Sequence, residues 1–139
     1  MNNIVLTKKA EDKEINWMYL DIECISNLVA AKISCMTSNV EIDENIKNID
    51  VYLSNSGKLE VVIGFGLGVD PNIEIKILRI NQNGHLKLEI NLDVDDSDCD
   101  SDIHKCIFFI ETELGLLEQF KERLKLMSKC NIGESISLV

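Results

Sequence analysis

Several residue types are scarce in this sequence of 139 residues. It has one proline, seven glycines, two histidines and one tryptophan. So little proline and glycine excludes collagen-like and linker-like sequence, and the 45% hydrophobic content argues against a disordered chain. No segment approaches the roughly 18 consecutive apolar residues that a membrane-spanning helix needs. The length suits one domain, so we expect residues 1–139 to form a single domain in which residues 1–14 are in part loose.

Basic residues are also scarce, because 14 Lys and Arg face 24 Asp and Glu, for a net charge of −10. Such a charge repels nucleic-acid backbones and anionic membrane surfaces. It favours solubility and association with basic partners. We therefore expect a protein partner and neither nucleic acid nor a membrane.

The cysteines are odd in number and irregularly spaced, and no Cys-x-x-Cys pair occurs. This pattern predicts reduced thiols, several of them packed as small hydrophobic residues. The N-terminal segment has only three consecutive apolar residues followed by lysines, unlike a secretory signal. We therefore expect a cytoplasmic protein. The cysteines are Cys24, Cys35, Cys99, Cys106 and Cys130.

Motifs for nucleotides, metals and catalysis are incomplete. The glycines at 64, 66 and 68 do not match Gly-x-Gly-x-x-Gly and are followed by turn residues, which predicts a strand with close backbone approach. The acidic segment 93–102 lacks the Gly and Glu of an EF-hand loop at the required positions. His85 and His104 are too few for a paired zinc site, and no Gly-x-Ser-x-Gly elbow occurs. We expect no enzyme activity, no catalytic residues, no cofactor and no metal.

Alternating apolar residues predict several β-strands. Residues 15–25 and 59–67 show this period clearly, and residues 29–36 are read as a strand although helix propensity is fair there. The pair Asn83-Gly84 is a strong hairpin signal between two further alternating runs, 73–77 and 86–92. Shorter strands are expected at 4–6, 106–110 and 132–139.

Two helices are expected between these strands. The first has Asp43 as its N-cap and ends at Gly57. The second starts at Thr112 and runs to about Lys129, with an apolar stripe that would pack on a sheet. The predicted fold is α+β, a mainly antiparallel sheet of about five to six strands with two helices, the long C-terminal one packed on the sheet.

Four stretches resemble the small immunity proteins of bacterial polymorphic-toxin and contact-dependent growth-inhibition systems, and among them the WapI-type immunity family. The stretch Asn16-Trp17-Met18-Tyr19-Leu20-Asp21-Ile22 is similar to that family's Asn-Trp-Leu strand opening. The other three are the helix around 45–53, the strand pair 59–65 and 73–80, and the closing strand and helix from 107 to 124.

The resemblance implies a cytoplasmic antitoxin that binds one cognate toxin domain, often a nuclease with a cationic site. An acidic protein can occupy such a site as a phosphate mimic. Alternatives are a small acidic ligand- or Ca²⁺-binding or interaction module without a toxin, and an enzyme using scattered carboxylates. The expected partner-binding residues are Asp95, Asp96, Asp98, Asp100 and Asp102 in the acidic loop, and Glu41, Asp43 and Glu44 near the start of the first helix.

Overall fold

The computed structural model describes residues 2–95 and 103–139. Within this part of the chain, neither helix is long and apolar enough to span a membrane. In chain order the elements are β1 (Asn3–Asp12), β2 (Trp17–Ile25), β3 (Ala30–Ser38), α1 (Asn39–Ser54), β4 (Val61–Phe65), β5 (Asn72–Ile77), β6 (Leu86–Asp95), β7 (Ile103–Thr112), α2 (Leu114–Leu124), a 3₁₀ turn (Met127–Lys129) and β8 (Ser135–Ser137).

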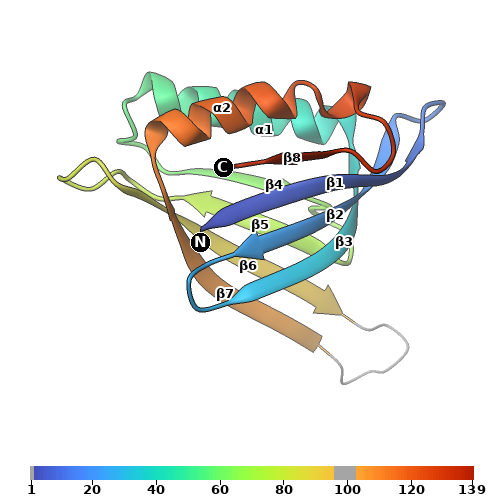
Figure 1. The fold of residues 1–139 in the computed structure, drawn as a ribbon, viewed down its shortest axis with the longest axis horizontal. Coiled ribbons are helices and arrows are strands. Elements are labelled where there is room, and N and C mark those ends of the chain that lie inside the picture. The colour runs from blue at the N-terminus through green and yellow to red at the C-terminus, as the bar shows by residue number, and fades with distance from the viewer. Residues whose placement is uncertain (1, 96–102) are drawn as a thin grey trace.

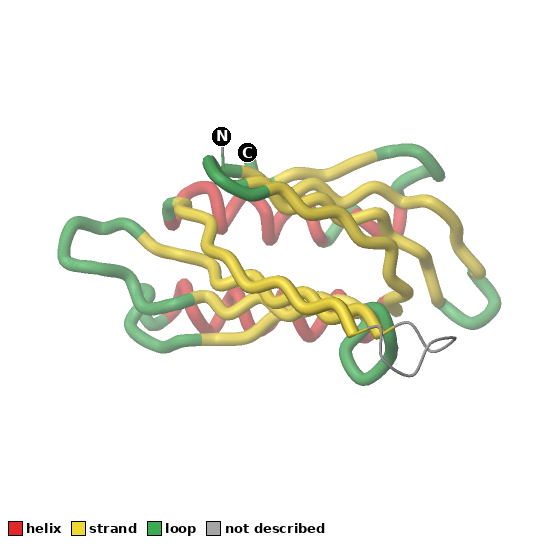
Figure 2. Tube along the Cα trace, turned by 90° about the horizontal axis from the view of Figure 1, so that it is seen from below, coloured by secondary structure: helices red, strands yellow, loops and turns green. Residues whose placement is uncertain are grey.

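The strands form two antiparallel sheets of four strands each (Figure 1). Their orders are β3-β2-β1-β8 and β4-β5-β6-β7. The predicted α+β class and antiparallel pairing are confirmed, but the expectation of five to six strands is too low. The helix between β3 and β4 carries the chain from one sheet to the other, so consecutive strands divide into two layers (Figure 2).

The core lies between the two layers and is a single cluster of buried side chains. Alternate residues of each strand supply it, such as Leu6, Leu20 and Ile22 from the first sheet and Ile75 and Ile90 from the second. Both helices lie along the side of the molecule where β4 and β8 are the edge strands (Figure 1). There α1 contacts β4, α2 contacts β8, and the helices contact each other.

Side chains of α1 hydrogen-bond the outer edge of β4. Asn45 donates to the carbonyl of Gly64 at 2.7 Å and accepts from its N–H at 3.0 Å, while Asn48 donates to the carbonyl of Val62 at 2.8 Å. These amides therefore take the place of a neighbouring strand. This satisfies backbone groups that an edge strand otherwise leaves unpaired.

Both helices differ from prediction. The N-cap of the first is Ser38, five residues before the expected cap at Asp43, and its side chain accepts the N–H of Glu41 at 3.2 Å. The C-terminal helix is the shorter of the two, with 11 residues against 16, and its N-cap is Glu113 instead of Thr112. Within the segment 1–14, Asn3–Asp12 form β1, which pairs with both β2 and β8.

The glycines after β4 allow close backbone approach, as expected. A Cβ on Gly64 would lie 2.7 Å from the carbonyl oxygen of Ile73. Gly66 has φ of +72° and a Cβ there would lie 2.9 Å from the carbonyl oxygen of Pro71. Only glycine fits both positions without strain.

Candidate interaction surface

The structure separates the predicted partner-binding residues into three groups. Asp96, Asp98, Asp100 and Asp102 lie outside the described residues, and for Asp95 only its backbone position at the end of β6 is described. Asp43 and Glu44 are exposed early in α1 and form no ion pair among the residues that the structure describes. These two carboxylates are therefore free to meet a partner.

Glu41, in contrast, holds the fold together. Its Oε1 accepts the hydroxyl of Thr37 at 2.6 Å and the N–H of Gly66 at 2.8 Å, and its Oε2 accepts the N–H of Leu67 at 3.1 Å. Three donors thus occupy the carboxylate and fix the end of β4 to α1. We leave Glu41 out of the candidate surface for this reason.

An exposed apolar surface lies beside the hairpin that joins β1 to β2. Its members are Ile15, Trp17, Tyr19 and Met36, here called the hairpin patch. Tyr19 lies directly opposite Met36 on β3. Ile15, Trp17 and Tyr19 are 60%, 36% and 45% exposed. Together with Ala10, Glu11, Asp12 and Met18, the four residues line a depression of about 260 Å³.

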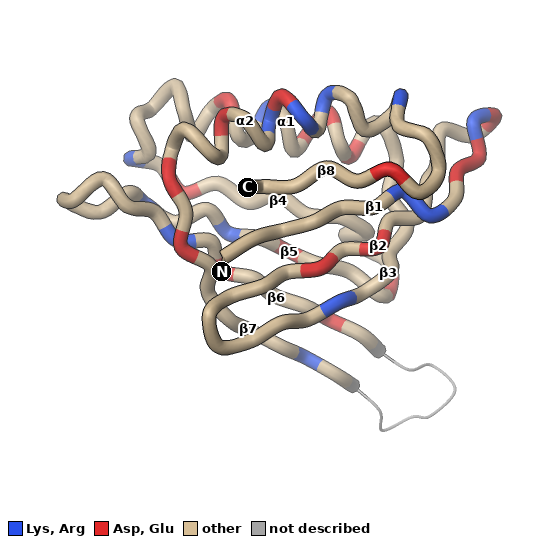
Figure 3. The backbone as a smooth tube through the Cα atoms, in the orientation of Figure 1, with Lys and Arg blue, Asp and Glu red and all other residues tan. Residues whose placement is uncertain are grey.

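Carboxylates flank the hairpin patch. Asp12 accepts the backbone N–H of Glu14 at 3.1 Å, which shapes the turn, and both side chains are exposed. Neither carboxylate forms an ion pair within residues 2–95 and 103–139. Figure 3 shows acidic and basic residues gathered at the hairpin tip, where Lys13 is paired with Glu11 at 3.8 Å. The start of α1 is attached nearby, because Asn39 donates its N–H to the carbonyl of Asn16 at 3.2 Å.

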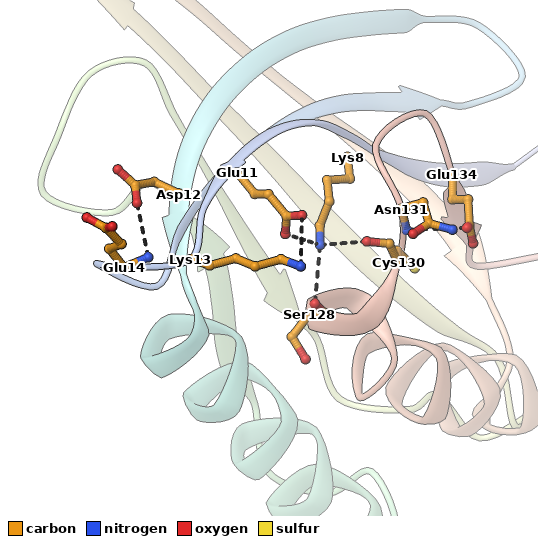
Figure 4. A network of polar contacts seen from close by, with 9 residues as sticks. All are labelled: Lys8, Glu11, Asp12, Lys13, Glu14, Ser128, Cys130, Asn131 and Glu134. Atoms are coloured by element: carbon orange, nitrogen blue, oxygen red, sulfur yellow. Dashed lines mark hydrogen bonds and ion pairs between the residues drawn. The ribbon is translucent and has the colours of Figure 1, made fainter.

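A buried lysine fixes the base of this hairpin (Figure 4). Lys8 is fully buried, and its Nζ donates to Glu11 Oε2 at 2.9 Å and to the carbonyls of Cys130 at 2.8 Å and Ser128 at 3.3 Å. These three acceptors match the three protons of the ammonium group. The hydrogen bond from Lys8, with its charge and that of Lys13, lowers the pKa of Glu11. The hairpin is thus joined to the C-terminal turn, which holds the hairpin patch in place.

The buried cysteine thiols are unreactive as nucleophiles. Cys24 and Cys35 are 1% and 0% exposed, and burial raises the pKa of each to about 12. Cys24, Cys35, Cys106 and Cys130 are all free in the described part of the chain. Packing of cysteines as small hydrophobic residues is confirmed for the first two. A thiol with so high a pKa is a poor nucleophile, so neither supports covalent catalysis.

Sequence reasoning passed over the hairpin patch, although a signal was present. The alternation that places Leu20 and Ile22 inside and Asp21 outside, continued toward the N-terminus, puts Tyr19 and Trp17 on the outer face. Met36 and Ile15 have no comparable signal, since their places depend on the pairing of β3 and on the hairpin turn.

Other candidate sites on the surface have less support than the hairpin patch. A wider depression of about 520 Å³ lies on α2, but its one large apolar lining residue is Leu126. No group of three or more His, Cys, Asp or Glu among the described residues could hold a metal ion.

No family model, curated protein or solved structure matches this chain.

Proposed function

We propose that this protein is an immunity protein that binds and neutralises a cognate toxin domain, and that the toxin is a nuclease with a cationic surface. The protein itself performs no catalysis in this proposal. Its cytoplasmic location would place it where such a toxin damages the cell that makes it. The sequence resemblance and the net charge of −10 support the proposal.

The hairpin patch is the observation that carries the binding part of this proposal. Trp, Tyr and Met are enriched at protein interfaces, and binding energy concentrates on a few aromatic anchors surrounded by polar residues. Trp17 and Tyr19 are exposed side by side on β2, with the unpaired carboxylates of Asp12 and Glu14 at the rim. This arrangement suits a partner that presents apolar and cationic side chains together.

Electrostatics explains why the partner should be cationic. A nuclease must attract phosphate, so the surface around its active site is basic. A protein with net charge −10 encounters such a surface faster and is repelled by other acidic surfaces. Asp43 and Glu44 on α1, whose start is attached to the hairpin through Asn39, would extend the negative field around the hairpin patch.

The alternative of a ligand-binding module has less support. Pockets for small molecules usually measure about 300 to 1,000 Å³ and bury most of the ligand. The depression at the hairpin patch, about 260 Å³, is smaller and lies open at the surface. The depression on α2, about 520 Å³, is also open and is lined mainly by charged and polar side chains, unlike the mostly apolar lining of such pockets. Ca²⁺ binding by the acidic segment remains the other alternative, and thermal stabilisation by Ca²⁺ would support it.

The proposal is tested by calorimetric titration into the C-terminal domain encoded by the gene directly upstream, at two salt concentrations. We expect one-to-one binding that weakens at the higher salt concentration, since screening reduces attraction between exposed charges. Trp17→Ala should weaken binding by roughly 30-fold or more, as expected for an aromatic anchor.

Leu59→Ala is the matched control, because Leu59 is 48% exposed and lies just before β4, a strand of the sheet that does not contain the hairpin. It should bind like the unmodified protein. No complex between two folded proteins would count against the immunity function, whereas equal weakening by both substitutions would remove only the assignment of the surface.

A further inference from the structure

The four edge strands differ in whether other groups bond to their outer sides. The edge of β4 is bonded by side chains of α1, and that of β8 by Arg123 of α2, whose Nη1 donates to the carbonyl of Ser137 at 2.7 Å. The edges formed by β3 and β7 lie on the side away from the helices (Figure 1). Among the described residues, no strand or side chain bonds to the outer edge of β7.

The β3 edge is covered along part of its length. Its C-terminal end lies against the turn after β4, where a Cβ on Gly66 would be 3.2 Å from the carbonyl oxygen of Met36. Lys32 near the start of β3 and Lys105 near the start of β7 are both exposed, so a lysine does not distinguish the two edges. Proteins commonly protect edge strands with lysines, prolines or covering segments, because unpaired edges invite pairing with another chain.

The outer face of β7 exposes large apolar side chains. Ile107 is 64% and Phe109 is 47% exposed, and they lie in the middle of a strand of ten residues without proline. Leu28, in the turn between β2 and β3, is 95% exposed and shares a depression of about 200 Å³ with Phe109 and Glu111. A large apolar surface beside an unpaired edge is a site where a further strand gains both hydrogen bonds and packing.

The sequence of β7 is complementary to itself. If two β7 strands pair antiparallel around a two-fold axis at Phe108, positions equally far from 108 lie opposite each other. Ile107 then lies opposite Phe109 of the second copy, and Lys105 lies opposite Glu111 of the second copy. Aromatic pairs with β-branched residues and pairs of opposite charge are both favourable across strands.

Other registers of the two β7 strands do not bring these apolar and oppositely charged residues together. Centring the axis on Ile107 places Lys105 opposite Phe109, and centring it on Phe109 places Ile107 opposite Glu111. A shift by one residue would turn one copy over, so that the outer face of one sheet continued into the core-facing side of the other. Only the register centred on Phe108 satisfies both the charges and the apolar side chains.

We propose that two copies of this chain associate through β7 in the register centred on Phe108. Their two four-stranded sheets then form one continuous antiparallel sheet across the two-fold axis. The hairpin patch belongs to the other sheet and stays available to a partner. This proposal therefore stands or fails independently of the immunity function.

Sedimentation velocity of the full chain over a concentration series tests the association, at about 0.15 M salt to screen the repulsion between acidic copies. We expect the mass to rise from 15.7 kDa toward twice that value. Ile107→Lys should abolish the rise, because it places a charge opposite Phe109 in the apolar centre. The control Val62→Lys, at an exposed residue of the same sheet on β4, should leave it unchanged.

A charge exchange tests the register. Lys105→Glu alone and Glu111→Lys alone should each raise the dimer dissociation constant by roughly tenfold, since each puts like charges opposite each other at two symmetric positions. The double exchange should restore much of the affinity. Circular dichroism confirms that each variant is folded. A protein that stays monomeric at several hundred micromolar, or a dimer indifferent to Ile107→Lys or to the single reversals, overturns the proposal.

Discussion

Asn45 shows how much of the fold depends on one side chain. It is 3% exposed and bonds both the N–H and the carbonyl of Gly64. Asn45→Ala leaves both backbone groups buried without partners, which we expect to lower the free energy of unfolding by about 3 kcal/mol. Urea denaturation measures this.

Asn48 provides the matched comparison, because it is exposed and makes a single bond to the carbonyl of Val62. Water can replace that bond, so Asn48→Ala should cost about 0.5 kcal/mol. Equal effects of the two substitutions would mean that α1 does not satisfy the β4 edge in the way described.

A second prediction concerns the contribution of the buried Lys8 to stability. Lys8→Met removes a buried ammonium and leaves the carbonyls of Ser128 and Cys130 without their donor, at a cost of about 2 kcal/mol near neutral pH. The neighbouring Lys9→Met should cost little, because Lys9 is 61% exposed.

The effect of Lys8→Met should depend on pH. The pKa of Glu11 is lowered in the folded protein, mainly by the hydrogen bond from Lys8, so their interaction stabilises the fold above the ordinary carboxylate pKa. That contribution is lost as the pH falls through the lowered pKa. The difference in stability between the two proteins should therefore shrink between neutral pH and about pH 3. A difference that stays constant across this range would contradict the assigned role of Glu11.

The turn after β4 can be tested at the scale of the element. Gly66 and Gly68 both have positive φ, but a Cβ at Gly66 meets backbone atoms whereas nothing lies within 4 Å of one at Gly68. Gly66→Ala should therefore destabilise the protein by about 3 kcal/mol and Gly68→Ala by about 1 kcal/mol. Thermal unfolding of both variants measures the difference, and a larger effect at Gly68 would contradict the described turn.

Most strands could be predicted from sequence, and the exceptions have physical causes. The strand β1 was predicted as residues 4–6 only, because Lys8 takes a core position where the pattern calls for an apolar residue. Its partners lie about 120 positions away, at Ser128 and Cys130, so no local window shows that this lysine is satisfied. The helix α2 ends at Leu124, ahead of the turn whose Ser128 and Cys130 carbonyls accept from Lys8, and that contact is equally invisible to a local window.

The start of α1 was misplaced for a related reason. Ser38, Asn39 and Asp43 are all acceptable N-caps, and propensity does not choose among them. The choice is made by Glu41, which must lie one turn into the helix to reach Gly66. A tertiary contact thus places the N-cap at Ser38, and the prediction of Asp43 from cap preference alone was wrong.

At the scale of the whole molecule, the α+β class was predictable and the division into two sheets was not. Alternation identifies strands, and the Asn83-Gly84 turn identifies one pairing, but neither shows which hairpins share a sheet. The candidate site was only half predictable. Acidic residues are visible in any sequence, whereas the hairpin patch requires residues from β2, β3 and the hairpin turn to be brought together.

The most direct test of the account uses the single tryptophan, since Trp17 lies in the hairpin patch and is 36% exposed. Labelling this chain with 5-fluorotryptophan gives one ¹⁹F resonance, which is followed while the unlabelled toxin domain is added. We expect the resonance to shift or broaden until one equivalent is bound, and to return toward its free position as salt dissociates the complex. A resonance that does not change in a sample where the complex has formed would contradict the central claim that the hairpin patch is the binding surface.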